Sequence, residues 1–369
     1  MSRLIEIVDP GDTGSLIAAL ASALSHDGPA LLPAVTVPAR LPAAVSQKVA
    51  VILETSGSTG RPKRVMLSAD ALLTNAAASD VALGVSGQWL LALPAQYVGG
   101  LNVLVRSIAS GTIPVTIEPG SFTSTRFVEA VHRMDGAHRF TSLVPAQLAR
   151  ILASDEATEA ARAFDRILLG GQVAPQDLLE SASALGVAVT RTYGATETSG
   201  GCVWDGMPIG DTVVRVLDGR VELAGPSLAE GYLDDDRRTA FAFRESNGRR
   251  WYRTDDAGEI IDGALTVLGR LDDIIVSGGV KVSIAAVERT VRELAGLSDA
   301  VVVAVPDVSW GEVAIVVTTT DAVLERVRTA VSLRLGAAAA PARILLLDTL
   351  PMLGSGKPDR VAIAALAAR

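Results

Sequence analysis

The sequence predicts an α/β protein with a large amino-terminal domain, built from parallel-sheet layers plus a small β subdomain, and a small carboxy-terminal α+β domain. Up to about residue 205, short apolar runs alternate with segments of helical periodicity, as in a parallel sheet covered by helices. Short strands and turns follow from about residue 208 and indicate an antiparallel subdomain. The last stretch, about 100 residues, orders strands and helices as a compact βαβ-type unit. We expect domains at 1–270 and 271–369.

Composition narrows the class of protein. The chain has 369 residues, 49% hydrophobic and 20% charged, which suits a large buried core. Its formal net charge of -8 argues against non-specific nucleic-acid binding. No window reads as a membrane span, and the first residues lack a signal peptide's basic start and apolar core. The single cysteine, Cys202, excludes an internal disulfide and a thiolate metal cluster, so we expect a cytoplasmic protein.

The first expected elements are a helix over 14–25 and a buried strand over 49–53, and the strand leads into the stretch TSGSTGRPK. Glycines let the backbone approach a ligand closely, successive backbone N–H groups form an anion-binding concavity, and hydroxyls and a lysine add donors. The alternative is a solvated linker; the stretch does not end as a Walker A loop does. We expect phosphate binding by Thr55, Ser56, Gly57, Ser58, Thr59, Gly60 and Lys63.

The next expected helix is capped by Ser68, and a short buried strand follows over 89–94. The segment after it, AQYVGGLNVLVRSIASG, has a helical apolar face that Arg106 interrupts. A charge at this place is either on a solvated helix face or buried and paired. In the second case Arg106 is a cation for a substrate carboxylate, and Tyr97 and the pair Gly99–Gly100 shape a pocket beside it.

Strands and helices continue to alternate up to residue 193. We expect strands over 113–117, 165–172 and 187–193, helices over 124–135 and 175–186, and a strand-to-helix run at FTSLVPAQLARIL. In a parallel sheet, the loops at the carboxyl ends of the strands hold the ligand. Gly170, Gly171 and Gln172 end one of these strands, so we expect them to flank a base or an acyl group.

The strand over 187–193 runs into the stretch YGATETSGG. Tyr193, followed by Gly194, can stack on a base, Thr196 can reach a phosphate, and the Glu197 carboxylate can hold Mg²⁺. The alternative is an ordinary turn, because glycine, threonine and glutamate are common in turns. The position at the end of a strand favours a nucleotide site.

The last third of the chain offers two further candidates. Asp256 lies in a turn of the antiparallel subdomain, as a carboxylate that holds ribose hydroxyls would. The glycine- and charge-rich stretch 269–283 marks the domain boundary, and Ser283 caps a helix. Strands over 300–305, 313–319 and 343–347 and a helix over 321–335 follow. Lys357 lies in a glycine-rich loop that either delivers a positive charge into a site or is a surface turn.

Five stretches together resemble the signature motifs of the adenylate-forming superfamily of acyl-CoA synthetases and adenylation domains. They are TSGSTGRPK at 55–63, YGATE at 193–197, YRTDDAG at 252–258, GRLDDIIVSGG at 269–279 and GSGKPDR at 354–360. Five motifs in order over most of the chain are far more specific than any one of them. The resemblance implies ATP, Mg²⁺ and coenzyme A as cofactors and substrates, and a mobile carboxy-terminal lid domain.

The resemblance implies a role for each motif. The 55–63 loop resembles a pyrophosphate clamp, and Thr196 and Glu197 resemble the phosphate and Mg²⁺ contacts. Lys357 matches the lysine that bridges the substrate carboxylate and the α-phosphate. The resemblance therefore implies that catalysis depends on the side chains of Thr196, Glu197 and Lys357.

Further implied roles belong to the nucleotide and the domain hinge. Asp256 and Arg270 resemble the ribose anchors, and Asp272 matches the hinge about which the small domain rotates. The family usually has Thr-Gly-Asp where this chain has Thr254-Asp255-Asp256, so Asp255 replaces a glycine while Asp256 keeps the ribose role. The chain is also shorter than most relatives at the amino end, and neither departure removes a catalytic group.

A narrower resemblance is to the short, actinobacterial o-succinylbenzoate–CoA ligases of menaquinone synthesis, and the segments PAQYVGGLNVLVRSIASG and ETSGGCVWDG carry it. Their substrate is a dicarboxylate, which needs one carboxylate free to react and a cation for the other. Arg106 fits the second need, and the resemblance implies a substrate pocket with Tyr97, Gly100, Ser199 and Gly200. Some relatives carry histidine where this chain has Tyr97.

Other functions stay open at this point. They are a CoA ligase for another aryl or fatty acid, an adenylating module that loads a carrier protein, and a catalytically inactive nucleotide-binding scaffold. A monocarboxylate pocket has no use for Arg106, and Lys357 together with Glu197 argues against the scaffold. The expected partners are o-succinylbenzoate, ATP and CoA, with no nucleic acid and no membrane; the sequence is compatible with a homodimer.

Overall fold

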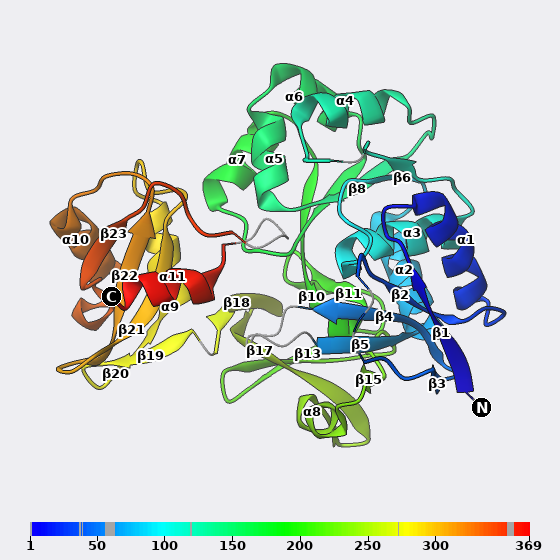
Figure 1. The fold of residues 1–369 in the computed structure, drawn as a ribbon. Coiled ribbons are helices and arrows are strands. Elements are labelled where there is room, and N and C mark those ends of the chain that lie inside the picture. The colour runs from blue at the N-terminus through cyan, green and yellow to red at the C-terminus, as the bar shows by residue number, and fades with distance from the viewer. Residues whose placement is uncertain are drawn as a thin grey trace. The chain divides into compact units, whose positions relative to one another are not determined.

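The computed structural model describes residues 2–36, 38, 40–55, 63–118, 120–271, 273–352 and 358–369 (Figure 1). The chain divides into two compact units. The first comprises Met1–Arg215, Glu222–Arg253 and Asp262–Leu265, and the second comprises Val216–Val221, Thr254–Ile261 and Thr266–Arg369. No helix among the described residues has the length and apolar content that crossing a bilayer requires.

The first unit begins with a six-stranded sheet in the order β15-β5-β4-β2-β1-β3. Its strands are β1 (Ser2–Val8), β2 (Ala30–Pro33), β3 (Ala44–Ser46), β4 (Val49–Thr55), β5 (Lys63–Ser68) and β15 (Gly231–Tyr232). Strand β4 matches the expected buried strand. Strands β1 to β3 were not expected: β2 and β3 lie in a stretch rich in alanine and proline, and β1 is defined by its pairing with both of them. β4 and β5 pair antiparallel with Thr55 opposite Lys63, so both ends of the candidate phosphate loop are fixed.

A second sheet of seven strands has the order β12-β11-β10-β9-β8-β6-β7. Its strands are β6 (Gln88–Leu91), β7 (Val115–Thr116), β8 (Arg139–Leu143), β9 (Arg166–Leu169), β10 (Val189–Ala195), β11 (Gly200–Trp204) and β12 (Met207–Pro208). β7, β6, β8, β9 and β10 run parallel, as the alternating pattern predicts. β11 and β12 then add on as antiparallel strands.

Seven helices cover the sheets of the first unit (Figure 1). They are α1 (Thr13–Leu24), α2 (Ala69–Leu83), α3 (Val98–Ser110), α4 (Ser124–His132), α5 (Pro145–Leu152), α6 (Asp155–Arg162) and α7 (Gln176–Ala184). Ser68 caps α2 as expected, with its hydroxyl accepting from the backbone N–H of Ala71. Helix α6 was not expected, because its sequence DEATEAAR has no run of large apolar residues.

Alternate residues of β6 show how the second sheet is sandwiched. Trp89 belongs to the apolar core that contains the buried residues of α1, α2 and α3, whereas Leu90 belongs to the core under α4 to α7. Successive strand residues point to opposite faces. One group of helices therefore covers each face, and the carboxyl ends of the parallel strands remain for a ligand.

A third sheet has the order β13-β14-β17-β16, with β18 paired to β17. Its elements are β13 (Val213–Leu217), β14 (Arg220–Ala224), β16 (Phe243–Ser246), β17 (Arg249–Ile261) and β18 (Ala264–Arg270), with the short helix α8 (Asp236–Ala242) before β16. β16 and β17 pair antiparallel. This is the small β subdomain that the sequence predicts.

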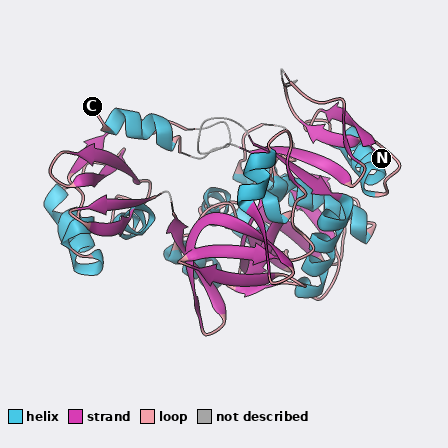
Figure 2. Ribbon diagram, turned by 90° about the horizontal axis from the view of Figure 1, so that it is seen from below, coloured by secondary structure: helices cyan, strands magenta, loops and turns pink. Residues whose placement is uncertain are grey.

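The elements from Ile274 onward all belong to the second unit and include a sheet in the order β20-β19-β22-β21, with β23 paired to β22. Its elements are β19 (Ile274–Ser277), β20 (Val280–Ser283), α9 (Ile284–Arg292), β21 (Val301–Asp307), β22 (Gly311–Thr318), α10 (Leu324–Leu335), β23 (Arg343–Leu346) and α11 (Arg360–Ala367). Ser283 caps α9, as expected. Figure 2 shows the carboxy-terminal helix on one side of this sheet and the other helices opposite, in agreement with its two apolar cores.

Candidate active site

The residues expected to bind a ligand in the first unit follow the carboxyl ends of three parallel strands of one sheet, β10, β9 and β6, with β8 between β9 and β6. Strand β9 ends before Gly170–Gln172, and β10 runs into the 3₁₀ turn Thr196–Thr198. Strand β6 ends ahead of Tyr97, which precedes α3. Because these strands are parallel, their carboxyl ends share one edge of the sheet, which is where open α/β sheets bind ligands.

The turn after β10 is rigidly held. The Thr198 hydroxyl accepts from the backbone N–H of Ala195 at 2.9 Å and donates to the carbonyl of Gly200 at 2.8 Å. Ser199 adopts a left-handed backbone conformation with φ of 55°. Thr196, Glu197 and Ser199 are all buried. The turn therefore presents its side chains in a fixed geometry.

The Glu197 carboxylate is 6% exposed, and its Oε1 accepts a hydrogen bond from the Tyr232 hydroxyl at 2.7 Å. Among the described residues it forms no ion pair. Lys63, the last residue of the candidate phosphate loop, places its Nζ 5.9 Å from the centroid of the Tyr232 ring. Thus two residues expected to contact phosphate and metal are gathered around one tyrosine; Ser56–Gly60 lie outside the described residues.

The donor set around Glu197 fits Mg²⁺ bound to a nucleotide. Mg²⁺ in phosphate-transfer sites is held by one or two carboxylates, substrate phosphates and waters rather than by a protein cage. Within the described part of the chain, no group of three or more His, Cys, Asp or Glu side chains could hold a metal ion. A single buried carboxylate without a cation partner meets the first requirement and leaves the remaining coordination to phosphate.

Tyr232 was not among the expected site residues. It lies in the segment 227–232, whose Ala229 N–H donates to the Glu197 carbonyl at 2.8 Å. The carbonyl of Ser227 in the same segment accepts from the Ser199 hydroxyl at 2.8 Å. Nothing in the sequence around Tyr232 distinguishes it from a core tyrosine, because its site contacts come from elements far away along the chain.

Glycines allow the backbones at this edge to approach closely. A Cβ at Gly170 would lie 2.7 Å from the Thr192 hydroxyl oxygen, and a Cβ at Gly194 would lie 2.1 Å from the Gly200 carbonyl oxygen. Gly171 has a φ of 81°. Gly170 thus lies against β10, the strand that carries Tyr193.

Helix α3 is joined to the turn after β10. The Asn102 side-chain amide donates to the Ser199 carbonyl at 2.8 Å, and a Cβ at Gly200 would lie 2.1 Å from its Nδ2. Gly100 is also required, because a Cβ there would lie 2.3 Å from the Pro94 carbonyl oxygen. The amino-terminal part of α3, which includes the expected substrate residue Gly100, thereby lies beside Ser199 and Gly200.

Arg106 lies one helical turn beyond Asn102 and is 4% exposed, so it is not on a solvated helix face. Its guanidinium carbon is 4.9 Å from the centroid of the Trp89 ring. Its Nε has no hydrogen-bond partner among the described residues. Burial lowers the pKa of Arg106 to about 10, with the Asp80 carboxylate opposing the shift, so the side chain stays cationic at neutral pH.

A second buried arginine shows what a structural role looks like. Arg3 is also 4% exposed. Its guanidinium donates to three backbone carbonyls, those of Gly28 at 2.6 Å, Val49 at 3.0 Å and Ala23 at 2.8 Å. Arg106 has no such set of acceptors in the described structure. Burying a charge without an ion-pair partner is costly. We therefore expect Arg106 to bind an anionic group of a ligand.

Within the second unit, the two expected ribose anchors are neighbours. Arg270 Nε lies 4.0 Å from the Asp256 carboxylate and its NH2 lies 3.4 Å from the Asp255 carboxylate. Asp255 also faces Arg220 at 3.4 Å. The acidic residue that replaces the family's glycine is therefore accommodated by two arginines, and it leaves Asp256 in place.

Two expected residues, Asp272 and Lys357, lie outside the described residues. On either side of the Lys357 loop, Met352 and Pro358 form an antiparallel bridge. The guanidinium of Arg360 pairs with the buried Glu288 carboxylate at 2.6 Å. Both flanks of the loop are thus anchored to the second unit.

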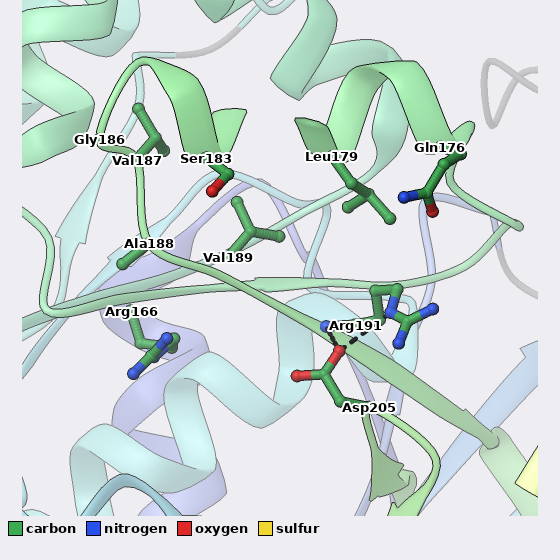
Figure 3. Close-up of a pocket in the computed structure, with 10 residues that line it drawn as sticks. All are labelled: Arg166, Gln176, Leu179, Ser183, Gly186, Val187, Ala188, Val189, Arg191 and Asp205. Carbon is green, nitrogen blue, oxygen red and sulfur yellow. Dashed lines mark hydrogen bonds and ion pairs between the residues drawn. The ribbon is translucent and has the colours of Figure 1, made fainter. Parts of the chain in front are cut away.

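A pocket of about 520 Å³ lies elsewhere in the first unit (Figure 3). It is lined by Arg166, Gln176, Leu179, Ser183, Gly186, Val187, Ala188, Val189, Arg191 and Asp205. Arg191 pairs with Asp205 at 2.9 Å across it. None of the ten lining residues is an expected site residue, so this pocket is separate from the candidate active site.

Comparisons with known proteins agree with the motifs. Residues 5–233 match the family model described as AMP-binding enzyme, and residues 286–357 match its C-terminal domain. A Mycobacterium tuberculosis protein named "Probable 2-succinylbenzoate--CoA ligase" is 38% identical, over 98% of this chain and 97% of that protein. The 2-succinylbenzoate–CoA ligase of Listeria monocytogenes is 28% identical, over 96% of this chain and 76% of that protein.

A solved structure shares the fold. The O-succinylbenzoate coenzyme A synthetase of Bacillus subtilis, in complex with AMP, superposes with a TM-score of 0.75 at 27% identity, covering 87% of this chain and 70% of that one. The structure of the same enzyme with its acyl-adenylate intermediate superposes with a TM-score of 0.76 at 25% identity, covering 94% and 80%. The expected α/β architecture with a small C-terminal domain is confirmed.

Gly200→Ala tests the close contact between α3 and the turn after β10. The new methyl group collides with the Asn102 amide, so we expect at least about a tenfold loss of activity as the turn shifts. Gly219→Ala is the control, because Gly219 also has a positive φ, 78°, but nothing within 4 Å of its Cβ position. Steady-state kinetics and thermal unfolding check both variants. Equal effects of the two substitutions would contradict the packing argument.

Proposed function

The chain belongs to the AMP-binding enzyme family, and from this premise we propose that it joins o-succinylbenzoate to coenzyme A through an acyl-adenylate, consuming ATP and releasing AMP and pyrophosphate. The relatives that match nearly its whole length carry this activity in their names. The protein would thus be an AMP-forming acid–thiol ligase of menaquinone biosynthesis. We place it in the cytoplasm, where ATP and CoA are available.

The single observation that carries the choice of acid is the buried Arg106 cation. Its Nε lacks a hydrogen-bond partner among the described residues, and its guanidinium lies against an aromatic ring rather than a carboxylate. A monocarboxylic acid brings one anion, which the reaction consumes. A dicarboxylate brings a second, and a charge-assisted pair with Arg106 would offset the desolvation of both groups.

In the first half-reaction, one substrate carboxylate attacks the α-phosphate of ATP and pyrophosphate leaves. Both reactants are anions, so positioning and positive charge lower the barrier most. We assign the pyrophosphate to the 55–63 loop with Lys63, the α-phosphate to Thr196 and Lys357, and the metal to Glu197. Bound Mg²⁺ would supply electrostatic stabilisation of the phosphate charge.

Other residues hold the nucleotide. We assign the base to Tyr193, Gly194 and the Gly170–Gln172 loop, and the ribose hydroxyls to Asp256 with Arg270. The Asp256 carboxylate can accept two hydroxyl hydrogen bonds, and Arg270, whose Nε lies 4.0 Å from it, helps to orient it.

In the second half-reaction, the CoA thiolate attacks the acyl carbon and AMP leaves. No cysteine or histidine nucleophile is needed, because the acid rather than the protein is activated. We propose that the small domain, residues 271–369, turns about Asp272 between the half-reactions, taking Lys357 away and bringing the 278–283 loop to the acyl group. One site would then serve two reactions.

Arg106→Leu tests the choice of acid. We expect the KM for o-succinylbenzoate to rise roughly ten- to a hundredfold, because a hydrogen bond between charged groups contributes about 1.5–3 kcal/mol. The KM for ATP should stay unchanged. The thermal midpoint should hold or rise, because the substitution removes an uncompensated buried charge.

The matched control is Arg166→Leu, at an exposed arginine on β9. It should leave both KM values unchanged. An unaltered KM for the acid in Arg106→Leu, together with a lower thermal midpoint, would assign Arg106 to the core instead of the substrate pocket.

Lys357→Ala tests the two-step mechanism. We expect adenylate formation to fall by at least about a hundredfold, because the charge that stabilises the transition state is lost. Thioester formation from a supplied acyl-adenylate should be largely spared. Pyrophosphate release and single-turnover thioester formation measure the two halves, with Lys48→Ala as an exposed-lysine control. Equal loss of both half-reactions would contradict the mechanism.

A further inference from the structure

The segment 227–232 holds the turn after β10 at three points. The carbonyl of Ser227 accepts from the Ser199 hydroxyl, and the N–H of Ala229 donates to the Glu197 carbonyl, both at 2.8 Å. The third contact is the Tyr232 hydroxyl on Glu197 Oε1 at 2.7 Å. The first contact uses the Ser199 side chain, the second fixes the backbone of the turn, and the third reaches the Glu197 carboxylate.

We propose that Tyr232 is a positioning residue that orients the Glu197 carboxylate toward the metal–phosphate group of ATP. The inference rests on the proposed function and deepens it, because it concerns how the same site holds its divalent cation. A metal-bound carboxylate needs outer hydrogen bonds that fix its rotation. The Tyr232 hydroxyl supplies one to Oε1, and Oε2 is left for the cation.

The chemistry of this contact favours a functional part. Tyr232 is 3% exposed and Glu197 is 6% exposed, so the bond is shielded from water. A hydrogen bond to an ionised acceptor in such surroundings is short and roughly twice as strong as one between neutral groups. Since the carboxylate forms no ion pair in the described structure, Tyr232 stabilises its charge without neutralising it, and the carboxylate keeps its affinity for a cation.

The tyrosine itself is firmly placed. Its backbone pairs with Val65 in β5, two residues after Lys63. Its N–H donates to the Thr239 hydroxyl at 2.9 Å. Its ring contacts the Phe243 ring with centroids 6.0 Å apart. The backbone and ring of Tyr232 are therefore fixed where its hydroxyl meets Glu197.

This placement links the two anion-binding elements of the first unit. Tyr232 joins β5, which begins at the end of the phosphate loop, to the turn that carries Glu197. The Lys63 ammonium over the ring adds positive charge on the loop side. Tyr232 thus connects β5 with the Glu197 carboxylate through its own side chain, which explains why a residue outside the motifs would affect metal binding.

The competing explanation is that Tyr232 only fills the core. It belongs to a large apolar cluster, and buried tyrosine hydroxyls usually find some partner. Tyr232→Phe separates the two explanations, because it keeps the ring and removes the hydroxyl. Thr158→Val is the matched control, since it deletes a buried hydroxyl whose hydrogen bond to the Ile151 carbonyl, 3.2 Å long, lies in α6 away from the site.

The experiment measures the Mg²⁺ dependence of pyrophosphate release and, by calorimetry, the affinity for ATP with Mg²⁺ and with EDTA. For Tyr232→Phe we expect the half-saturating Mg²⁺ concentration to rise roughly ten- to a hundredfold. We expect affinity for ATP with Mg²⁺ to fall, affinity in EDTA to hold, and the KM for the acid to hold. Thr158→Val should match the wild type in all four measurements.

A Tyr232→Phe variant with wild-type Mg²⁺ dependence and wild-type affinity for ATP with Mg²⁺ overturns the inference, whatever its thermal midpoint. A failure of the proposed function looks different, because the wild-type protein itself would then not turn over o-succinylbenzoate. In that case calorimetry alone decides the inference: a loss of affinity confined to ATP with Mg²⁺ supports it, and equal losses with Mg²⁺ and with EDTA overturn it.

Discussion

The Glu197 carboxylate is buried at the end of β10 and has no cation partner in the described structure. Contacts from the 227–232 segment of the first unit hold this residue in place. Burying an ionised group is costly unless hydrogen bonds or an opposite charge compensate it. The Tyr232 hydroxyl supplies part of the compensation, and a divalent cation would supply the rest. The tight turn at Thr198 and the pairing of β15 with β5 hold the carboxylate in one position.

Arg106 is the corresponding case of a buried positive charge. It is buried on α3, keeps a pKa of about 10, and has an Nε with no partner in the described structure. Asn102, one turn earlier, binds the turn that carries Glu197. Neither the buried anion nor the buried cation has an ion-pair partner in the described structure. A reaction between metal-bound ATP and an acid with a spare carboxylate would supply a partner for each. Arg3, whose charge is satisfied by three carbonyls, shows that burial alone does not imply this role.

Local signals made much of the fold and of the site predictable. The Ser68 cap and the apolar β4 run depend on neighbours in the chain, so the sequence reveals them. Strands β1 to β3 are defined by pairing with distant strands and were missed. Tyr232 was missed for the same reason, since it meets Glu197 across 35 residues. For Arg106, the sequence left two alternatives, and only burial among other elements decided between them.

The most direct test of the central claim is a coupled pyrophosphate-release assay with ATP, Mg²⁺ and a panel of carboxylic acids, with and without CoA. The account predicts turnover with o-succinylbenzoate alone among the panel, with AMP and the CoA thioester as products. Turnover with a monocarboxylic acid and none with o-succinylbenzoate would contradict the role given to Arg106. If no acid of the panel is turned over, the proposed ligase activity itself is contradicted.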